Sequence, residues 1–137
     1  MKFHGFVFGH VEVEINGRAY DLHNFYQANA INYNIVDRSA ILIFTRRPEA
    51  WVPAEGARKI TVSFHEINYF SASGRGENPI DGDSSVIHSI GVVESDAETQ
   101  AFYLTENIQP DHHLVMCFES GLTLRVQAAE ARCEISF

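Results

Sequence analysis

Hydrophobic residues recur at every second position along much of the chain, the spacing typical of strands that bury one face. Residues 11–15, VEVEI, alternate apolar and acidic side chains, and Asn16 and Gly17 follow them directly. An Asn-Gly pair suits a two-residue type I′ turn, because both central positions of that turn have positive φ. We therefore predict a hairpin whose return strand covers residues 19–22.

A second hairpin is predicted from the next alternating segment. Residues 31–35 have apolar side chains at odd positions, residues 37–39 provide the turn, and residues 40–45 form the return strand. Residues 40–44, AILIF, are apolar on both faces. This composition favours a strand that is covered on both sides over a strand with a solvent-exposed face.

The apolar pattern changes phase within residues 59–70. Apolar residues occupy even positions from 60 to 64 and odd positions from 67 to 69. A strand exchanges its two faces only by gaining or losing a residue. The pattern therefore predicts a bulge or a sharp bend near His65 and Glu66.

The remaining chain contains further short strands and one ambiguous segment. Strands are expected at residues 86–94, on both sides of a turn at residues 119–121, and at residues 131–137. Residues 95–108 fit two structures equally well: a helix that begins with a capping box at Ser95, or another strand. Proline and glycine mark residues 46–58 as a long loop.

These patterns predict one all-β domain covering residues 1–137. A chain of this length builds a single core. We expect an antiparallel β-sandwich or a partly closed barrel of about eight to ten short strands, with at most one or two short helices.

Charge and composition narrow the functional classes. The chain has 18 acidic and 10 basic residues, and its formal net charge is -8. Such a field repels phosphate backbones and anionic lipids, so we expect neither a nucleic-acid partner nor a membrane. No segment has the pattern of a signal peptide or the length of about 18 apolar residues that spans a bilayer, which predicts a cytoplasmic protein. Cys117 and Cys133 lack the spacing of a zinc site or a disulfide framework, so free thiols and no cofactor are expected.

Seven histidines raise the possibility of catalysis. No His-x-His pair is present to place two ligands on one face of a strand, so no metal site is predicted. His65 and Glu66 at the predicted bulge, and His88 in the strand at 86–94, are the candidates for acid–base chemistry. In this alternative, the protein is a small-ligand or metal-dependent β-barrel enzyme whose interior pocket is lined by these residues and His113.

The preferred hypothesis is a non-enzymatic protein-interaction domain. Trp51, the only tryptophan, stands in the loop 46–58 between two prolines and close to Arg46 and Arg47. Exposed tryptophan and arginine are typical of interface hot spots. The competing interpretation is that the loop folds back and Trp51 caps the open end of the sandwich. The partner is either a basic protein, as for an immunity protein or antitoxin, or a second copy of the chain in a homo-oligomer.

Overall fold

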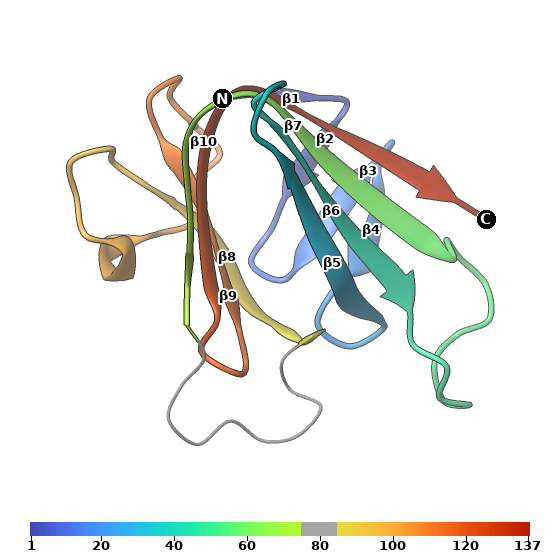
Figure 1. Ribbon diagram of the computed structural model, residues 1–137. Helices are drawn as coiled ribbons and strands as arrows, with labels where there is room; N and C mark the ends of the chain where they lie inside the picture. The colour runs from blue at the N-terminus through green and yellow to red at the C-terminus, as the bar shows by residue number, and fades with distance from the viewer. Residues whose placement is uncertain (75–84) are drawn as a thin grey trace.

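The computed structural model describes residues 1–74 and 85–137 and consists of β-strands packed around one core (Figure 1). The described strands are β1 (Lys2–His4), β2 (Phe6–Phe8), β3 (Glu12–Ile15), β4 (Arg18–Asp21), β5 (Tyr26–Asn34), β6 (Ser39–Arg46), β7 (Lys59–Ser73), β8 (Ile87–Val93), β9 (His113–Phe118) and β10 (Thr123–Ser136). A single 3₁₀ turn, η2 (Thr99–Ala101), is the one named helical element in the described residues. The predicted all-β class is confirmed.

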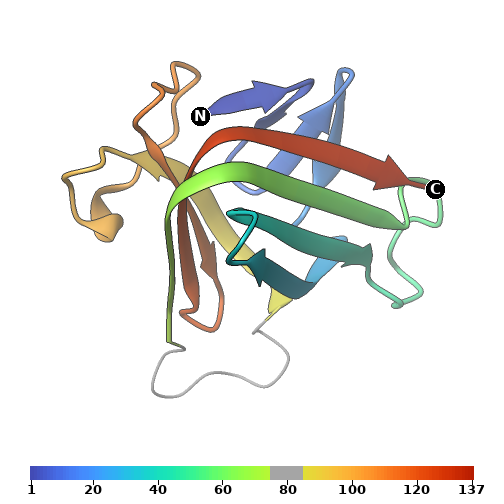
Figure 2. The ribbon, with the colours of Figure 1, turned by 45° about the horizontal axis from the view of Figure 1, so that its top comes forward.

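The strands form a large curled sheet and a small sheet. Sheet A has the order β5-β6-β7-β10-β9-β8, with β1 added parallel to β10, and all its other pairs are antiparallel. β7 and β10 are long and bent, so they run through both arms of the curled sheet (Figure 2). Residues 123–126 of β10 pair with β9, and residues 130–132 pair with β1. Sheet B has the order β2-β3-β4.

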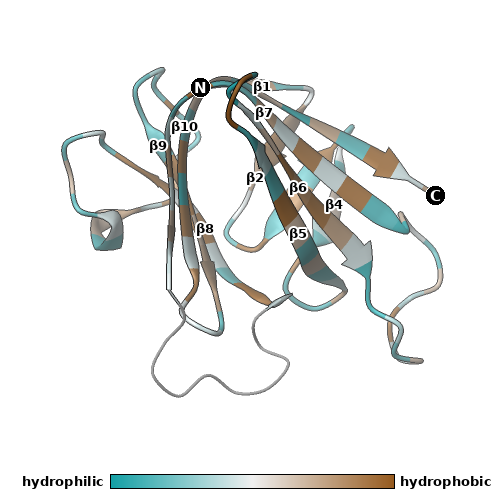
Figure 3. Cartoon of the chain, viewed as in Figure 1, coloured by the Kyte–Doolittle hydropathy of each residue, from teal (hydrophilic) through white to brown (hydrophobic). Residues whose placement is uncertain are grey.

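The core lies between the concave face of sheet A and sheet B. Bands of apolar and polar residues alternate along β6 and β7 (Figure 3), as expected for strands with one buried face. The two sheets contribute to a single cluster of buried side chains. Its members include Phe6, Val13 and Tyr20 from sheet B and Leu42, Phe44, Ile60, Val62, Phe64 and Met116 from sheet A. Burying side chains of this size stabilises the fold by about 1.5–3 kcal/mol each.

The two predicted hairpins are present. β3 and β4 are joined by Asn16 and Gly17, whose φ angles are 53° and 78°, as a type I′ turn requires. β5 pairs with β6 across a turn in which Arg38 has a φ of 52°.

The phase change within β7 corresponds to a bulge. Glu66 has a φ of 55°, and the register between β7 and β10 shifts opposite Gln127 and Ala128. The next backbone amide, at Ile67, donates to the carbonyl of Arg38 over 2.9 Å. The irregular backbone therefore also anchors the β5–β6 turn.

Two local predictions were wrong. Leu42 is 2% exposed, but its neighbour Ile41 is 41% exposed, so β6 is covered on one side only. No described segment lies over the convex surface at Ile41, although the residue is apolar. Residues 95–108 form neither a regular helix nor a strand, because Arg125 holds the first part of the segment as a loop and Tyr103 makes an isolated bridge with Val92.

The two strands expected on either side of residue 128 are one continuous strand, β10. Within the described residues, no helix is both long enough and apolar enough to cross a membrane.

Candidate binding site

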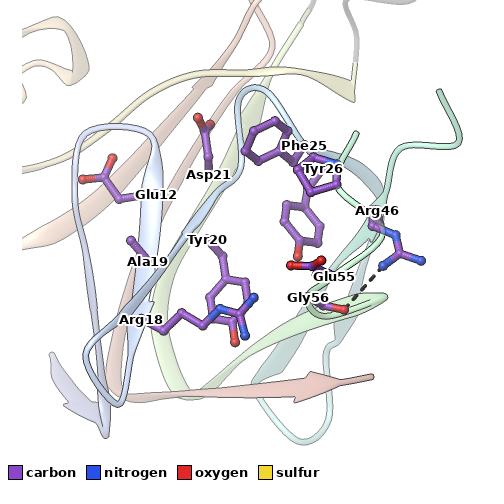
Figure 4. A pocket seen from close by; sticks show the side chains of 11 residues that line it. Glu12, Arg18, Ala19, Tyr20, Asp21, Phe25, Tyr26, Arg46, Glu55 and Gly56 are labelled. Carbon is purple, nitrogen blue, oxygen red and sulfur yellow. Dashed lines mark hydrogen bonds between the residues drawn. The ribbon is translucent and has the colours of Figure 1, made fainter. Parts of the chain in front are cut away.

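A cleft of about 440 Å³ opens between β4 and the loop that follows β6. We call it the β4 cleft (Figure 4). Two stretches that are far apart in the sequence form its walls: sheet B with the adjoining turn and the start of β5, and the end of β6 with the β6–β7 loop. Its lining residues are Glu12, Arg18, Ala19, Tyr20, Asp21, Phe25, Tyr26, Arg46, Pro53, Glu55 and Gly56.

Two buried tyrosines form the inner wall of the cleft. Tyr20 is 5% exposed and Tyr26 is 4% exposed, and their ring centroids lie 6.4 Å apart at 73°. The hydroxyl of Tyr26 donates to the carbonyl of Ala57 over 2.9 Å. Burial, followed by the neighbouring Tyr20, raises the pKa of Tyr26 above its ordinary value, so this phenol stays protonated at neutral pH. It joins the cleft wall to the β6–β7 loop.

Two guanidinium groups lie at the cleft. Arg18 stacks over Tyr20 with its Cζ 5.2 Å from the ring centroid. Arg46 donates from Nη1 to the carbonyls of Ala54 and Gly56 over 2.6 and 3.4 Å. Among residues 1–74 and 85–137, neither group forms an ion pair with a carboxylate. The carboxylates of Glu12, Asp21 and Glu55 line the cleft beside them, so the lining carries both signs of charge.

Arg47, the second candidate arginine, holds the loop in place. Its Nε donates to the carbonyl of Tyr26 over 3.1 Å, and its Nη2 donates to the carbonyl of His23 over 2.9 Å. Its backbone amide also donates to the carbonyl of Phe25 over 2.9 Å. The guanidinium is thus used to fix the loop against the turn before β5. Arg47 is a positioning residue for this surface.

Trp51 projects from the same loop and is 60% exposed. Its ring contacts that of Phe25, with centroids 6.3 Å apart and an interplanar angle of 52°. Phe25 in turn lines the cleft. The indole therefore does not cap the core, and Trp51 and Phe25 form an aromatic shelf beside the β4 cleft.

The structure does not bring the candidate acid–base residues together. His65 lies on the convex face of β7, with Nε2 3.2 Å from the hydroxyl of Ser63, and Glu66 is exposed at the bulge. His88 is exposed on β8, and its Nδ1 is 3.1 Å from the hydroxyl of Ser89. β10 and β9 separate these two strands in sheet A. His113 is buried elsewhere, beside Arg125.

Three other histidines each lie close to a single carboxylate. His4 lies 2.8 Å from Glu130, and this hydrogen bond lowers the pKa of the Glu130 carboxyl. His23 lies 3.8 Å from Glu119, and His112 lies 3.9 Å from Glu94. Among the described residues, no group of three or more His, Cys, Asp or Glu side chains is placed to hold a metal ion.

The sequence identified one residue on the cleft wall, Arg46, and one on its aromatic shelf, Trp51, but missed the others. Arg18 and Tyr20 occupy alternate positions of β4 and therefore lie on one face of it. The return strand predicted at residues 19–22 did not include Arg18, so this pair was not predicted. Phe25 and Tyr26 lie where the chain turns away from sheet B, and no local pattern predicts which surface they reach.

Comparisons with protein-family models, curated proteins and solved structures found no match for this chain.

Proposed function

We propose that this protein is a non-enzymatic interaction domain that binds another protein through Trp51, Phe25 and the adjoining β4 cleft. The observation that carries the proposal is the 60% exposure of Trp51 on a loop that two arginine side chains fix. A large exposed aromatic ring beside a concave surface is typical of a protein-binding site.

Two physical properties favour binding at Trp51: its indole is exposed to water in the free protein, and its loop is already ordered. Tryptophan, tyrosine and arginine contribute disproportionately to interface energies, because they bury a large area and still supply hydrogen-bond donors. Binding also costs less when the loop is already ordered. The bonds made by Arg46 and Arg47 meet that condition, so binding does not have to immobilise the loop.

We propose a basic protein as the partner. The net charge of -8 would speed encounter with a positively charged surface. At the cleft itself, three carboxylates line the wall beside two guanidinium groups, so the lining suits the same basic partner. An immunity or antitoxin role in the cytoplasm fits this description, and the two free cysteines, Cys117 and Cys133, suit a reducing compartment.

Affinity purification with matched variants tests the proposal. Wild-type protein, Trp51→Ala and Val36→Ala serve as baits, because Val36 is 90% exposed on the β5–β6 turn and its loss controls for removal of a surface apolar group. We expect a stoichiometric protein partner that the wild type and Val36→Ala retain. Titration of that partner should show binding about 30-fold weaker for Trp51→Ala, since a hot-spot tryptophan contributes about 2 kcal/mol.

Thermal unfolding of the same three proteins separates binding from stability. An exposed indole contributes little to folding, so Trp51→Ala should unfold close to the wild-type temperature. A partner that binds Trp51→Ala as tightly as wild type would contradict the proposal. Association of the bait only with itself, measured by light scattering, would replace it with the homo-oligomer.

A further inference from the structure

A second concave surface lies along β2, at the opposite edge of sheet B from β4, and shares only Glu12 with the β4 cleft. We call it the phenylalanine groove. It has a volume of about 680 Å³ and runs between β2 and residues 104–108. This volume falls within the range of about 300–1,000 Å³ that is usual for binding pockets. Trp51 does not line this groove.

The floor of the groove is aromatic. Phe3, Phe6 and Phe8 pack against one another with ring centroids 5.1 Å, 5.9 Å and 5.3 Å apart. Phe6 belongs to the hydrophobic core, and Phe3 and Phe8 pack against that core. Packing therefore fixes the positions of all three rings. Val7 is 55% exposed and Leu104 is 57% exposed at the sides. Apolar area therefore remains open to water above a preformed floor.

Every charged side chain on the described wall of the groove is acidic. These are Glu12, Glu14 and Glu106. None of the three forms an ion pair within residues 1–74 and 85–137. The ammonium group of Met1 does not neutralise them directly, because it donates to the carbonyls of Gln109 and Pro110 over 3.3 and 3.0 Å. The groove combines an apolar floor with a negative rim.

The groove also runs beside a free strand edge. β2 is the outer strand of sheet B and pairs only with β3 among the described strands. A strand edge of this kind can accept an extended peptide through backbone hydrogen bonds, with alternate side chains entering a neighbouring pocket. An extended chain therefore fits this site better than a compact ligand.

We propose that the phenylalanine groove binds an extended basic segment of a partner protein. An apolar side chain of that segment lies on Phe3, Phe6 and Phe8, and lysine or arginine side chains lie against Glu14 and Glu106. A second copy of this chain is a poor occupant, because both copies carry a charge of -8 and repel each other.

The probe for this proposal is a short fluorescent peptide in which leucine and lysine alternate. Its affinity is measured by fluorescence anisotropy at about 0.1 M salt, where the Debye length is about 10 Å. Two matched peptides replace every leucine by serine or every lysine by glutamate. We expect binding of the first peptide only, because the site needs both the apolar and the cationic side chains.

Variants of the protein locate the binding site. The double variant Glu14→Gln, Glu106→Gln and the single variant Leu104→Ser should each weaken binding about tenfold, which corresponds to about 1.4 kcal/mol. Glu134→Gln and Val36→Ser are the matched controls, because both residues are exposed on other strands or turns. Their affinities should stay within about twofold of wild type.

Hydrogen exchange distinguishes binding at this groove from non-specific attraction of the peptide to an acidic protein, because non-specific attraction does not slow the exchange of particular amides. The amides of Phe6 and Phe8 should exchange more slowly when the peptide is bound. Three outcomes overturn the proposal: no binding by the leucine–lysine peptide, equal weakening by the control variants, or protection at another edge such as β5. Because Trp51→Ala leaves this groove intact, it should bind the peptide as wild type does, even if the Trp51 proposal fails.

Discussion

Arg125 donates its Nε proton to Nδ1 of His113 over 2.8 Å, and both side chains are buried. This bond makes Nδ1 an acceptor, so the imidazole is neutral and carries its proton on Nε2. The remaining donors of Arg125 reach the loop that follows β8. They contact the carbonyls of Ala97, Glu94 and Ser95 and the hydroxyl of Thr99 at 2.9–3.3 Å.

The guanidinium of Arg125 therefore holds this loop against sheet A. The ring of Tyr69 packs on the same guanidinium, with the ring centroid 5.5 Å from Cζ of Arg125. We expect Arg125→Lys to lower the free energy of unfolding by about 3 kcal/mol. Lysine keeps the charge but has fewer donors and no planar fork, so buried carbonyls lose their partners. Urea denaturation followed by circular dichroism measures the change.

Arg132→Lys provides the matched control in the same strand. Arg132 is exposed, and its one described ion pair, with Glu130, is at 3.5 Å. Such a pair contributes about 0–1 kcal/mol. Equal stability losses for the two variants would show that Arg125 does not hold the loop.

His113 should make the stability of the protein depend on pH. Burial, followed by the positive charge of Arg125, lowers the pKa of His113 below its ordinary value. The unfolded chain keeps the ordinary value of about 6.5 and therefore binds the proton first as the pH falls. The contribution of His113 to stability is thus complete above about pH 6.5 and is lost as the pH falls toward the lower folded-state pKa.

The variant His113→Asn isolates this effect. Asparagine presents an oxygen near the position of Nδ1 but does not titrate, so the variant should lose less stability than wild type between about pH 7 and pH 5. Denaturation curves at several pH values give the two slopes. The same loss in both proteins would show that protonation of His113 is not coupled to folding.

Local patterns in the sequence predicted the parts of the fold that neighbouring residues determine. Asn16 and Gly17 define a turn by their own backbone preferences, and the phase change before Ile67 marks a bulge without reference to any partner strand. The conformation of residues 95–108 depends instead on Arg125, which lies in a distant strand. No spacing within the segment contains that information.

In the candidate site, too, neighbouring residues determine some features and distant contacts determine others. The composition of the β6–β7 loop identified Trp51 as a candidate, but its exposure depends on bonds from Arg47 to the turn at residues 23–26. The β4 cleft forms where residues 12–26 meet residues 46–56, and the pattern within one strand does not predict that contact. The order of the strands in sheet A also separates His65 from His88. The alternating pattern within a single strand does not determine that order.

Cys133 should be unreactive in the folded protein. It lies on the concave side of β10, opposite Val62, and burial, followed by the charge of Glu134, raises the pKa of its thiol to about 12. The thiolate is the reactive species, so alkylation at neutral pH should be slow. In the single-thiol variant Cys117→Ser, N-ethylmaleimide should label Cys133 only after denaturation, as mass spectrometry would show. Rapid labelling of the folded variant would contradict the burial of this side chain.

Gly91 permits the segment after η2 to lie directly on β8. A Cβ atom added at this position would lie 2.6 Å from Cδ2 of Phe102 and 2.8 Å from the carbonyl oxygen of Tyr103. Tyr103 exchanges two backbone hydrogen bonds of 2.8 Å with Val92, so the segment cannot move away without losing them. Gly91→Ala should therefore lower the free energy of unfolding by about 1–3 kcal/mol, the usual cost of overpacking.

Hydrogen exchange would show which backbone amides lose protection in Gly91→Ala. The amides of Val92 and Tyr103 should exchange faster in the variant, whereas amides in sheet B should not change. Gly74→Ala is the control, since no atom lies within 4 Å of the Cβ it would add. If Gly91→Ala were as stable as Gly74→Ala and kept the Tyr103 amide protected, the segment would have to sit farther from β8 than these contacts require.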